Sequence, residues 1–231
     1  MNLLAHALLA APDSGLMLGS AIGDFVRGAI DPDLPPRVRA GVVLHRSVDS
    51  FTDAHREVAA ARALFDPPFR RYAGILIDVW FDHLLARQWA EHGEGELDAF
   101  SRRVRLLLSA NTAIVPERMR GFVAYLEAHD LPAAYRETAV IGDALRGMSH
   151  RLSRANPLDD ALTMLVARHA PLQRRFDAFF PELRAFADAR RAELLRDEGA
   201  SPTEPETRTP PEGGVPESAR ERVTSPGRAS S

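Results

Sequence analysis

Hydrophobic and polar positions along the first 195 residues follow helical spacing rather than strand spacing. Apolar residues gather on one face of successive segments, and proline or glycine marks most of the boundaries between them. No window shows the sustained one-to-one alternation that is typical of a half-buried strand. The pattern therefore predicts an all-α fold, with a single helical domain over residues 1–196.

The boundaries of the helices follow from their flanking residues. The expected helices span residues 2–11, 15–27, 35–53, 56–65, 69–91, 97–109, 116–128 and 132–151, and a last long segment runs from 156 to about 195. Proline lacks the N–H that a helix interior needs, so we expect this last segment to be kinked or broken at Pro171 and Pro181. Gly15, Gly19 and Gly23 allow another backbone to approach closely.

After Gly199 the composition changes to proline, glutamate, serine, threonine, arginine and glycine, with almost no apolar residues. Such a segment cannot bury enough surface to offset the entropy of ordering it. Residues 197–231 are therefore predicted to be a disordered tail.

The overall composition excludes several classes of protein. Hydrophobic residues make up 45% of the chain, which is enough for a core, yet no run reaches the roughly 18 apolar residues of a membrane span. The net charge of -3 lacks the basic excess of a nucleic-acid-binding protein. Cysteine is absent, so any metal must use histidine and carboxylate ligands. We expect a cytoplasmic protein with neither a nucleic acid nor a membrane as partner.

One stretch combines histidine and aspartate at helical spacing. His45, Asp49 and Asp53 lie at positions i, i+4 and i+8, so their side chains share one face of a helix. A solvated face in which the two carboxylates pair with Arg46 and Arg56 is the alternative, and it would contribute little to stability.

A second stretch places carboxylates inside an apolar run. Asp78 and Asp82 lie one turn apart between Ile75 and Leu85, and His83 follows directly. Burying a carboxylate costs several kcal/mol unless a cation or a hydrogen-bond donor contacts it. Two such helices predict a metal site between them, and hence a metal-dependent hydrolase; manganese, magnesium, iron or zinc suits these ligands.

Arginine supplies candidate phosphate ligands, because guanidinium binds phosphate through two parallel hydrogen bonds. Arg27, Arg46 and Arg151 fit this role, and ordinary surface ion pairing is the alternative for each. A lone histidine such as His6 on an apolar helix is usually a hydrogen-bonded core residue rather than a metal ligand, and Asp24 could form a salt bridge at a helix end.

These motifs together resemble the acyl carrier protein phosphodiesterase family over about residues 1–195. The resemblance rests on five motifs in order: Asn2-x-Leu4-Ala5-His6, Gly23-Asp24-Phe25-Val26-Arg27-Gly28, His45-Arg46-x-x-Asp49-x-x-Thr52-Asp53, Asp78-x-x-x-Asp82-His83 and Gly147-Met148. It implies a helical fold distantly related to HD-domain phosphohydrolases. It also implies an enzyme that removes 4'-phosphopantetheine from holo acyl carrier protein with a divalent cation, manganese being favoured.

Asp49 is a metal-ligand candidate from the His–Asp spacing. Carried over by position, the resemblance implies six metal-ligand candidates besides it: His6, Asp24, His45, Asp78, Asp82 and His83. In the expected mechanism, an activated water attacks phosphorus in line and Arg27 or Arg46 holds the non-bridging oxygens. The catalytic candidates are Asp24, His45, Asp78 and His83; His83 or His45, if not a ligand, would protonate the leaving serine.

The partner expected from the resemblance is the acidic holo acyl carrier protein. An arginine surface formed by Arg37, Arg39, Arg46, Arg70 and Arg71 is the candidate docking face. Two other functions stay open from the sequence. One is an HD-like phosphohydrolase acting on nucleotides or other small phosphoesters, and the other is a non-catalytic helical binding module whose His and Asp residues form structural ion pairs.

Overall fold

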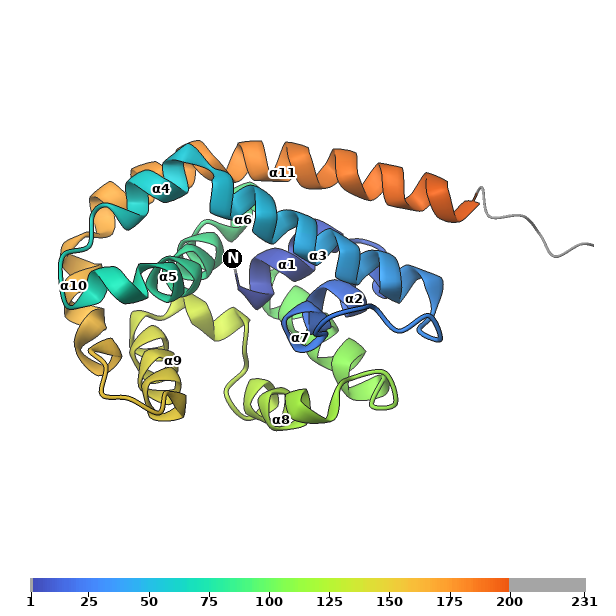
Figure 1. The fold of residues 1–231 in the computed structure, drawn as a ribbon, viewed down its shortest axis with the longest axis horizontal. Coiled ribbons are helices and arrows are strands. Elements are labelled where there is room, and N and C mark those ends of the chain that lie inside the picture. Colours follow the sequence, from blue (N-terminus) through green and yellow to red (C-terminus); the bar gives the residue numbers. More distant parts are fainter. Residues whose placement is uncertain (1, 200–231) are drawn as a thin grey trace, which may run out of the picture. The chain divides into compact units, whose positions relative to one another are not determined.

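The computed structural model describes residues 2–199, and all regular secondary structure within that range is helical (Figure 1). The predicted all-α class is confirmed. The α-helices are α1 (Leu3–Ala10), α2 (Ser14–Ile22), α3 (Pro36–Ala54), α4 (Arg56–Arg62), α5 (Ala73–Arg87), α6 (Trp89–His92), α7 (Leu97–Ala110), α8 (Arg120–Ala128), α9 (Thr138–Arg151), α10 (Ala161–Ala167) and α11 (His169–Gly199). Short 3-10 turns join several of them, including η1 (Gly23–Phe25). The predicted tail lies outside the described residues from 200 onward, and residues 197–199 continue α11.

Helix α1 lies in the interior of the helical unit, since each of its residues from Leu3 to Ala10 is buried. Its N-terminal N–H groups need acceptors because they have no partners within the helix. The buried carboxylate of Asp82, on α5, accepts hydrogen bonds from the backbone N–H groups of Asn2, Leu4 and Ala5, at 3.3, 2.8 and 3.3 Å. These bonds fix the start of α1 against α5.

Helices α2 and α3 approach each other closely at two glycines. A side chain at Gly19 would overlap the carbonyl oxygen of Val38, and one at Gly41 would overlap that of Leu16. The close approach that was expected from the glycine spacing is present at Gly19. It brings the end of α2, and the η1 turn that follows it, against the middle of α3.

Helix α11 continues through Pro181, so this proline does not break the helix, which was one of the two outcomes expected for it. Its apolar face lies in the core, where the ring centroids of Phe176 and Phe179 are 5.4 and 5.9 Å from that of Phe81 on α5. Burying several phenylalanines contributes roughly 1.5–3 kcal/mol each, which exceeds the roughly 3 kcal/mol cost of one internal proline. Packing therefore keeps the helix continuous.

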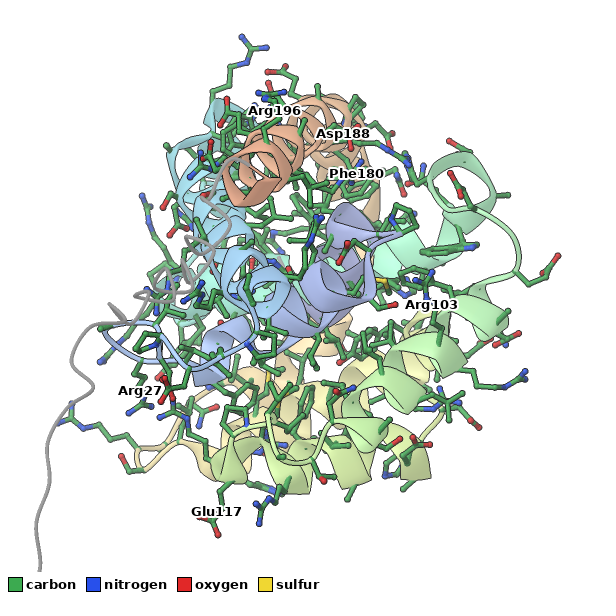
Figure 2. The ribbon with its side chains drawn as sticks, turned by 90° about the vertical axis from the view of Figure 1, so that its right-hand side faces the viewer. Arg27, Arg103, Glu117, Phe180, Asp188 and Arg196 are labelled. Carbon is green, nitrogen blue, oxygen red and sulfur yellow. The ribbon has the colours of Figure 1, made fainter. Side chains whose placement is uncertain are left out.

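Charged side chains cover the outside of this helical unit. Arg27, Arg103 and Glu117 lie at its surface, whereas Phe180 is fully buried (Figure 2). No helix among residues 2–199 is both long enough and apolar enough to cross a membrane.

Candidate metal centre

Two histidines and two aspartates from three elements converge beside the interior helix. His6 comes from α1, Asp24 from η1, and His45 and Asp49 from α3. Nε2 of His45 lies 3.1 Å from Asp49 Oδ2 and 3.4 Å from Asp24 Oδ1, and Nε2 of His6 lies 3.1 Å from Asp49 Oδ1. One ligand atom from each of His6, His45 and Asp49 lies within 4.8 Å of the other two, which is close enough to share one cation.

The His45 ring is held in one orientation by its other nitrogen. Nδ1 lies 2.9 Å from the backbone carbonyl oxygen of Ser20, to which it can only donate. In the neutral ring, Nε2 therefore presents its lone pair toward the two carboxylates. Metal-ligating histidines usually have this arrangement, with one nitrogen on the metal and the other donating to a carbonyl or carboxylate.

His6 is 1% exposed and stacks on His45, with the ring centroids 3.9 Å apart. Neither of its ring nitrogens makes a hydrogen bond that meets geometric criteria among the described residues, although Nε2 lies 3.1 Å from Oδ1 of Asp49. Burial and the neighbouring His45 lower the pKa of His6 to about 4. The ring is therefore neutral at pH 7 and can act as a ligand.

The charges of the other three groups match a site for a positive charge. Burial opposes protonation of His45, but its contacts with Asp24 and Asp49 raise its pKa to about 9. Burial opposes ionisation of Asp49, yet His45 and His6 hold the pKa of that carboxyl well below its usual range. The contact with His45 also lowers the pKa of Asp24. The carboxylates of Asp24 and Asp49 thus both lie close to Nε2 of His45, which carries a proton when no cation is bound there.

These donors fit a divalent cation. A buried, unpartnered imidazole nitrogen, a second imidazole with a fixed tautomer, and one or two carboxylates suit manganese, magnesium, iron or zinc. The surroundings of His45 are also closely packed, since a side chain at Gly23 would overlap its ring. A residue other than glycine at that position would displace His45.

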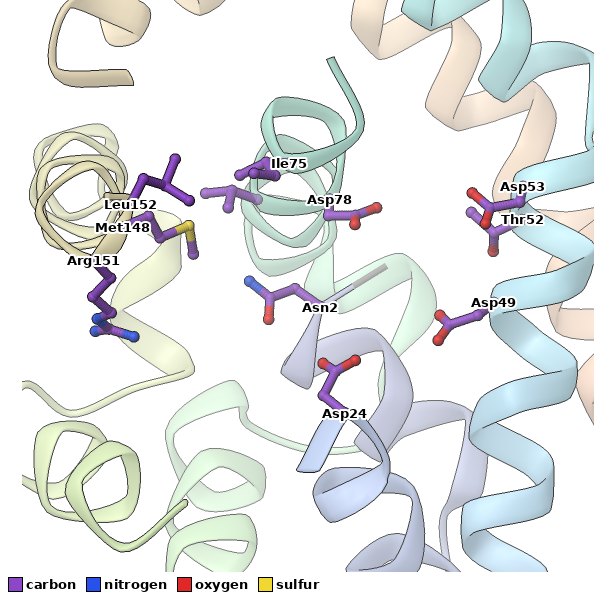
Figure 3. A pocket seen from close by; sticks show the side chains of 11 residues that line it. Asn2, Asp24, Asp49, Thr52, Asp53, Ile75, Asp78, Met148, Arg151 and Leu152 are labelled. Atoms are coloured by element: carbon purple, nitrogen blue, oxygen red, sulfur yellow. The ribbon is translucent and has the colours of Figure 1, made fainter. Parts of the chain in front are cut away.

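A cavity of about 470 Å³ opens beside this cluster (Figure 3). Asp49 and Asp53 of α3 form one wall, α5 lies between, and Arg151 of α9 lies on the far side. The complete lining is Asn2, Asp24, Asp49, Thr52, Asp53, Ile75, Asp78, Val79, Met148, Arg151 and Leu152. Its volume falls within the range typical of small-molecule sites.

Asp78 and Arg151 lie in this cavity wall, on the α5 and α9 sides. Burial raises the pKa of Asp78, so its carboxyl holds a proton to a higher pH than an exposed aspartate does. A smaller cavity of about 150 Å³, lined by His6 and His45, shares Arg151, Asn2 and Asp24 with the larger one. Arg151 thus borders both openings to the histidine pair.

Asp82 and His83 do not belong to the group of ligand atoms that converges at His6, His45 and Asp49. The Asp82 carboxylate is used by the N–H groups of α1, and burial raises its pKa to about 7. His83 is fully buried, with Nδ1 2.7 Å from the carbonyl oxygen of Tyr135, and burial lowers its pKa. Neither residue lines either cavity next to the cluster.

Arg27 and Arg46 also lie outside the cavity lining. Nη2 of Arg46 donates to the carbonyl oxygens of Val26 and Gly28, at 3.0 and 2.8 Å. It therefore holds the segment that follows Asp24, rather than facing the cavity. Arg27 is exposed.

Comparison with known proteins fits this geometry. A family model described as acyl carrier protein phosphodiesterase matches residues 1–183. The chain belongs to the acyl carrier protein phosphodiesterase family. The enzyme of that name from Yersinia pestis is 33% identical over 184 residues, which cover 79% of this chain and 95% of the relative. The one from Escherichia coli O157:H7 (strain EC4115 / EHEC) is 35% identical over 188 residues, covering 81% and 97%.

Membership of the acyl carrier protein phosphodiesterase family confirms the predicted resemblance and the predicted class of enzyme, a phosphoric diester hydrolase. It also sets aside the non-catalytic binding module. No solved structure matches the chain, so the distant relation to HD-domain phosphohydrolases stays a prediction.

Sequence reasoning assigned no role to three residues of this site. Ser20 orients His45 through its carbonyl oxygen and donates its hydroxyl to the carbonyl oxygen of His6, at 3.0 Å. Thr52 and Leu152 line the cavity. A backbone carbonyl has no sequence signal, whereas Thr52 could have been found from its position three residues after Asp49, on the same helix face.

Proposed function

We propose that this enzyme hydrolyses the phosphodiester that joins 4'-phosphopantetheine to a serine of holo acyl carrier protein, using a divalent cation, most suitably Mn²⁺. The observation that carries the proposal is the convergence of His6, His45 and Asp49 at the edge of a 470 Å³ cavity. The names of the relatives support the carrier-protein substrate. A cytoplasmic location agrees with such a substrate and with the absence of cysteine.

His6, His45 and Asp49 would hold the cation, with Asp24 as a further ligand or as an acceptor for a bound water. A divalent cation in such a site lowers the pKa of water and stabilises negative charge on a phosphoryl oxygen. The two carboxylates balance its charge, and Ser20 keeps the His45 ring in the orientation that ligation requires.

The remaining residues position the diester and move its protons. Arg151 binds a non-bridging phosphoryl oxygen from the α9 side of the cavity. Asp24, which is exposed, accepts a proton from the attacking water as its oxygen bonds to phosphorus. The bond from phosphorus to the serine oxygen breaks, and Asp78 protonates that oxygen, since its raised pKa favours the acid form. The products are apo carrier protein and 4'-phosphopantetheine.

This assignment of the leaving-group acid favours Asp78 over His83, because Asp78 lines the cavity and His83 does not. His45 is unsuited to that role when it ligates the cation. Asp78→Asn should therefore reduce turnover by about 100-fold or more while far-UV circular dichroism stays unchanged. Activity equal to wild type in this variant would refute the role of Asp78.

The acidic carrier protein would approach a basic surface, for which the candidates are Arg37, Arg39, Arg46, Arg70 and Arg71. Arg37 is paired with Asp13 at 3.6 Å, and Arg39 donates to the carbonyl oxygen of Pro32 at 2.8 Å. The Arg37 side chain is exposed and that of Arg39 is half-buried. Arg37→Glu with Arg39→Glu should raise the apparent KM; an unchanged KM would move the docking face elsewhere.

The decisive experiment incubates purified holo acyl carrier protein with the enzyme and follows the carrier protein by intact-protein mass spectrometry. Loss of the phosphopantetheine mass with Mn²⁺, and its retention with a chelator, would support reaction, substrate and cofactor together. Hydrolysis of small phosphodiesters without any loss from holo carrier protein would refute the substrate and favour a small-molecule phosphohydrolase.

A further inference from the structure

Thr52 lines the cavity beside the candidate metal centre, and its buried hydroxyl has no hydrogen-bond partner among the described residues. Thr52 is 3% exposed and lies between Asp49 and Asp53 on the cavity side of α3 (Figure 3). Its Oγ1 has no hydrogen-bond partner among the described residues. A buried hydroxyl left in this state costs stability, because its interaction with water is lost and nothing replaces it.

Other hydroxyl groups of the same helix satisfy themselves locally. Ser47 donates to the carbonyl oxygen of Val43, and Ser50 to that of Arg46, each at 2.9 Å. Threonine in a helix commonly forms the same bond to the carbonyl four residues earlier. Thr52 does not bond to Val48 in this way, although the geometry of the helix offers it. Its hydroxyl is the exception in α3, and it occurs at the cavity.

The unpartnered hydroxyl of Thr52 belongs to a residue that lines the same cavity as Asp49 of the candidate metal centre. Thr52 follows Asp49 by three residues, so the two side chains share one face of α3. Threonine in helices divides between two χ1 rotamers, so its hydroxyl can change direction without movement of the backbone. A ligand bound in the cavity would therefore lie beside both Asp49 and Thr52.

We propose that Thr52 donates a hydrogen bond to a phosphoryl oxygen of the bound phosphodiester. The inference rests on the proposed function and extends it with a substrate-binding residue on the α3 side of the cavity. Arg151 lies on the opposite side, so the two residues hold the phosphate from both walls. A neutral donor suits the α3 wall, where the carboxylates of Asp49 and Asp53 would repel the phosphate and where Thr52 alone of the three can donate.

The test compares Thr52→Val, which keeps the shape and removes the hydroxyl, with Thr52→Ser, which keeps the hydroxyl. Ser50→Ala is the matched control, because its hydroxyl is exposed and bonded within α3. We measure kcat/KM on holo carrier protein with Mn²⁺, the affinity for the product 4'-phosphopantetheine by calorimetry, the affinity for Mn²⁺, and the melting temperature.

Thr52→Val should lower kcat/KM and weaken 4'-phosphopantetheine binding by about tenfold or more each, as expected for a lost hydrogen bond to a charged group. Thr52→Ser should restore both to within about threefold, and Ser50→Ala should change neither. Mn²⁺ affinity should stay the same in all variants. Thr52→Val should melt no lower than wild type, since it removes an unpartnered buried hydroxyl.

Two results would overturn the inference. A Thr52→Val enzyme with unchanged kcat/KM and product affinity would show that the hydroxyl does not contact phosphate. The hydroxyl would instead be structural if Thr52→Val melted several degrees lower than wild type and Thr52→Ser recovered the melting temperature but not the product affinity. Failure of the proposed function would give a different result, because the wild-type enzyme itself would then leave holo carrier protein intact. The affinity for 4'-phosphopantetheine would still test the role of Thr52 in that case.

Discussion

Gly23→Ala gives a sharp test of the candidate metal centre, because it displaces the proposed ligand His45 without substituting any ligand residue. Gly23 has an ordinary right-handed conformation, so alanine introduces no backbone strain there. Its Cβ would overlap the His45 ring, with Nδ1 only 2.6 Å away. Ordinary contact begins near 3.4 Å, so the ring must move by about 1 Å or the η1 turn must shift by as much.

A displacement of this size is enough to disable catalysis. His45 cannot retreat freely, because it is stacked on His6 and its Nδ1 is bonded to Ser20. A misplacement of about 1 Å in a catalytic constellation costs on the order of 100-fold in rate. We therefore expect Gly23→Ala to lower kcat/KM by about 100-fold and to weaken Mn²⁺ binding, while the helical circular dichroism signal is kept.

The assay is release of phosphopantetheine from holo carrier protein under saturating Mn²⁺, together with calorimetric titration of the metal. Gly121→Ala is the matched control, because nothing lies within 4 Å of the added Cβ in α8. The control should keep wild-type activity. A Gly23→Ala enzyme with kcat/KM and Mn²⁺ affinity both within threefold of wild type would refute the assignment of His45 as a tightly packed ligand.

Three further predictions concern stability. Asp82→Ala should lower the free energy of unfolding by about 3 kcal/mol in urea titrations, because three backbone N–H groups at the start of α1 lose their acceptor; a loss below about 1 kcal/mol would contradict this role. Chelation should lower the melting temperature of the Mn²⁺-loaded wild-type enzyme, because a bound metal stabilises the folded state. It should not lower the melting temperature of Asp49→Asn, which lacks one proposed ligand. Equal shifts in the two proteins would argue against Asp49 as a ligand. In metal-free protein the free energy of unfolding should fall by up to about 3 kcal/mol as pH rises from 6.5 to 9, because native His45, with a pKa of about 9, keeps a proton that the unfolded chain gives up near 6.5. His45→Asn should flatten that slope, and an identical slope in both proteins would disprove the raised pKa.

Local sequence determined the helices and the spacing of the chemical groups along them. Proline and glycine marked most boundaries, and periodicity predicted that His45 and Asp49 share one helix face, as they do in α3. The resemblance to the family motifs added His6 and Asp24 to the predicted metal ligands. Helical spacing is a local property of the sequence, and the family motifs are recognised by their order along the chain. Neither signal depends on how the helices pack against one another.

Only the tertiary structure decided which of these groups meet. Asp78 and Asp82 lie one turn apart on α5 and look equivalent in sequence, yet Asp78 faces the cavity and Asp82 is used by the N-terminus of α1. Arg46 lies beside His45 in the chain but bonds to the carbonyl oxygens after η1. Helical periodicity gives the face on which a residue lies, but not the element that packs against that face. That choice depends on contacts far apart in sequence, such as the close approach at Gly19 and Gly41, which brings the η1 turn to α3.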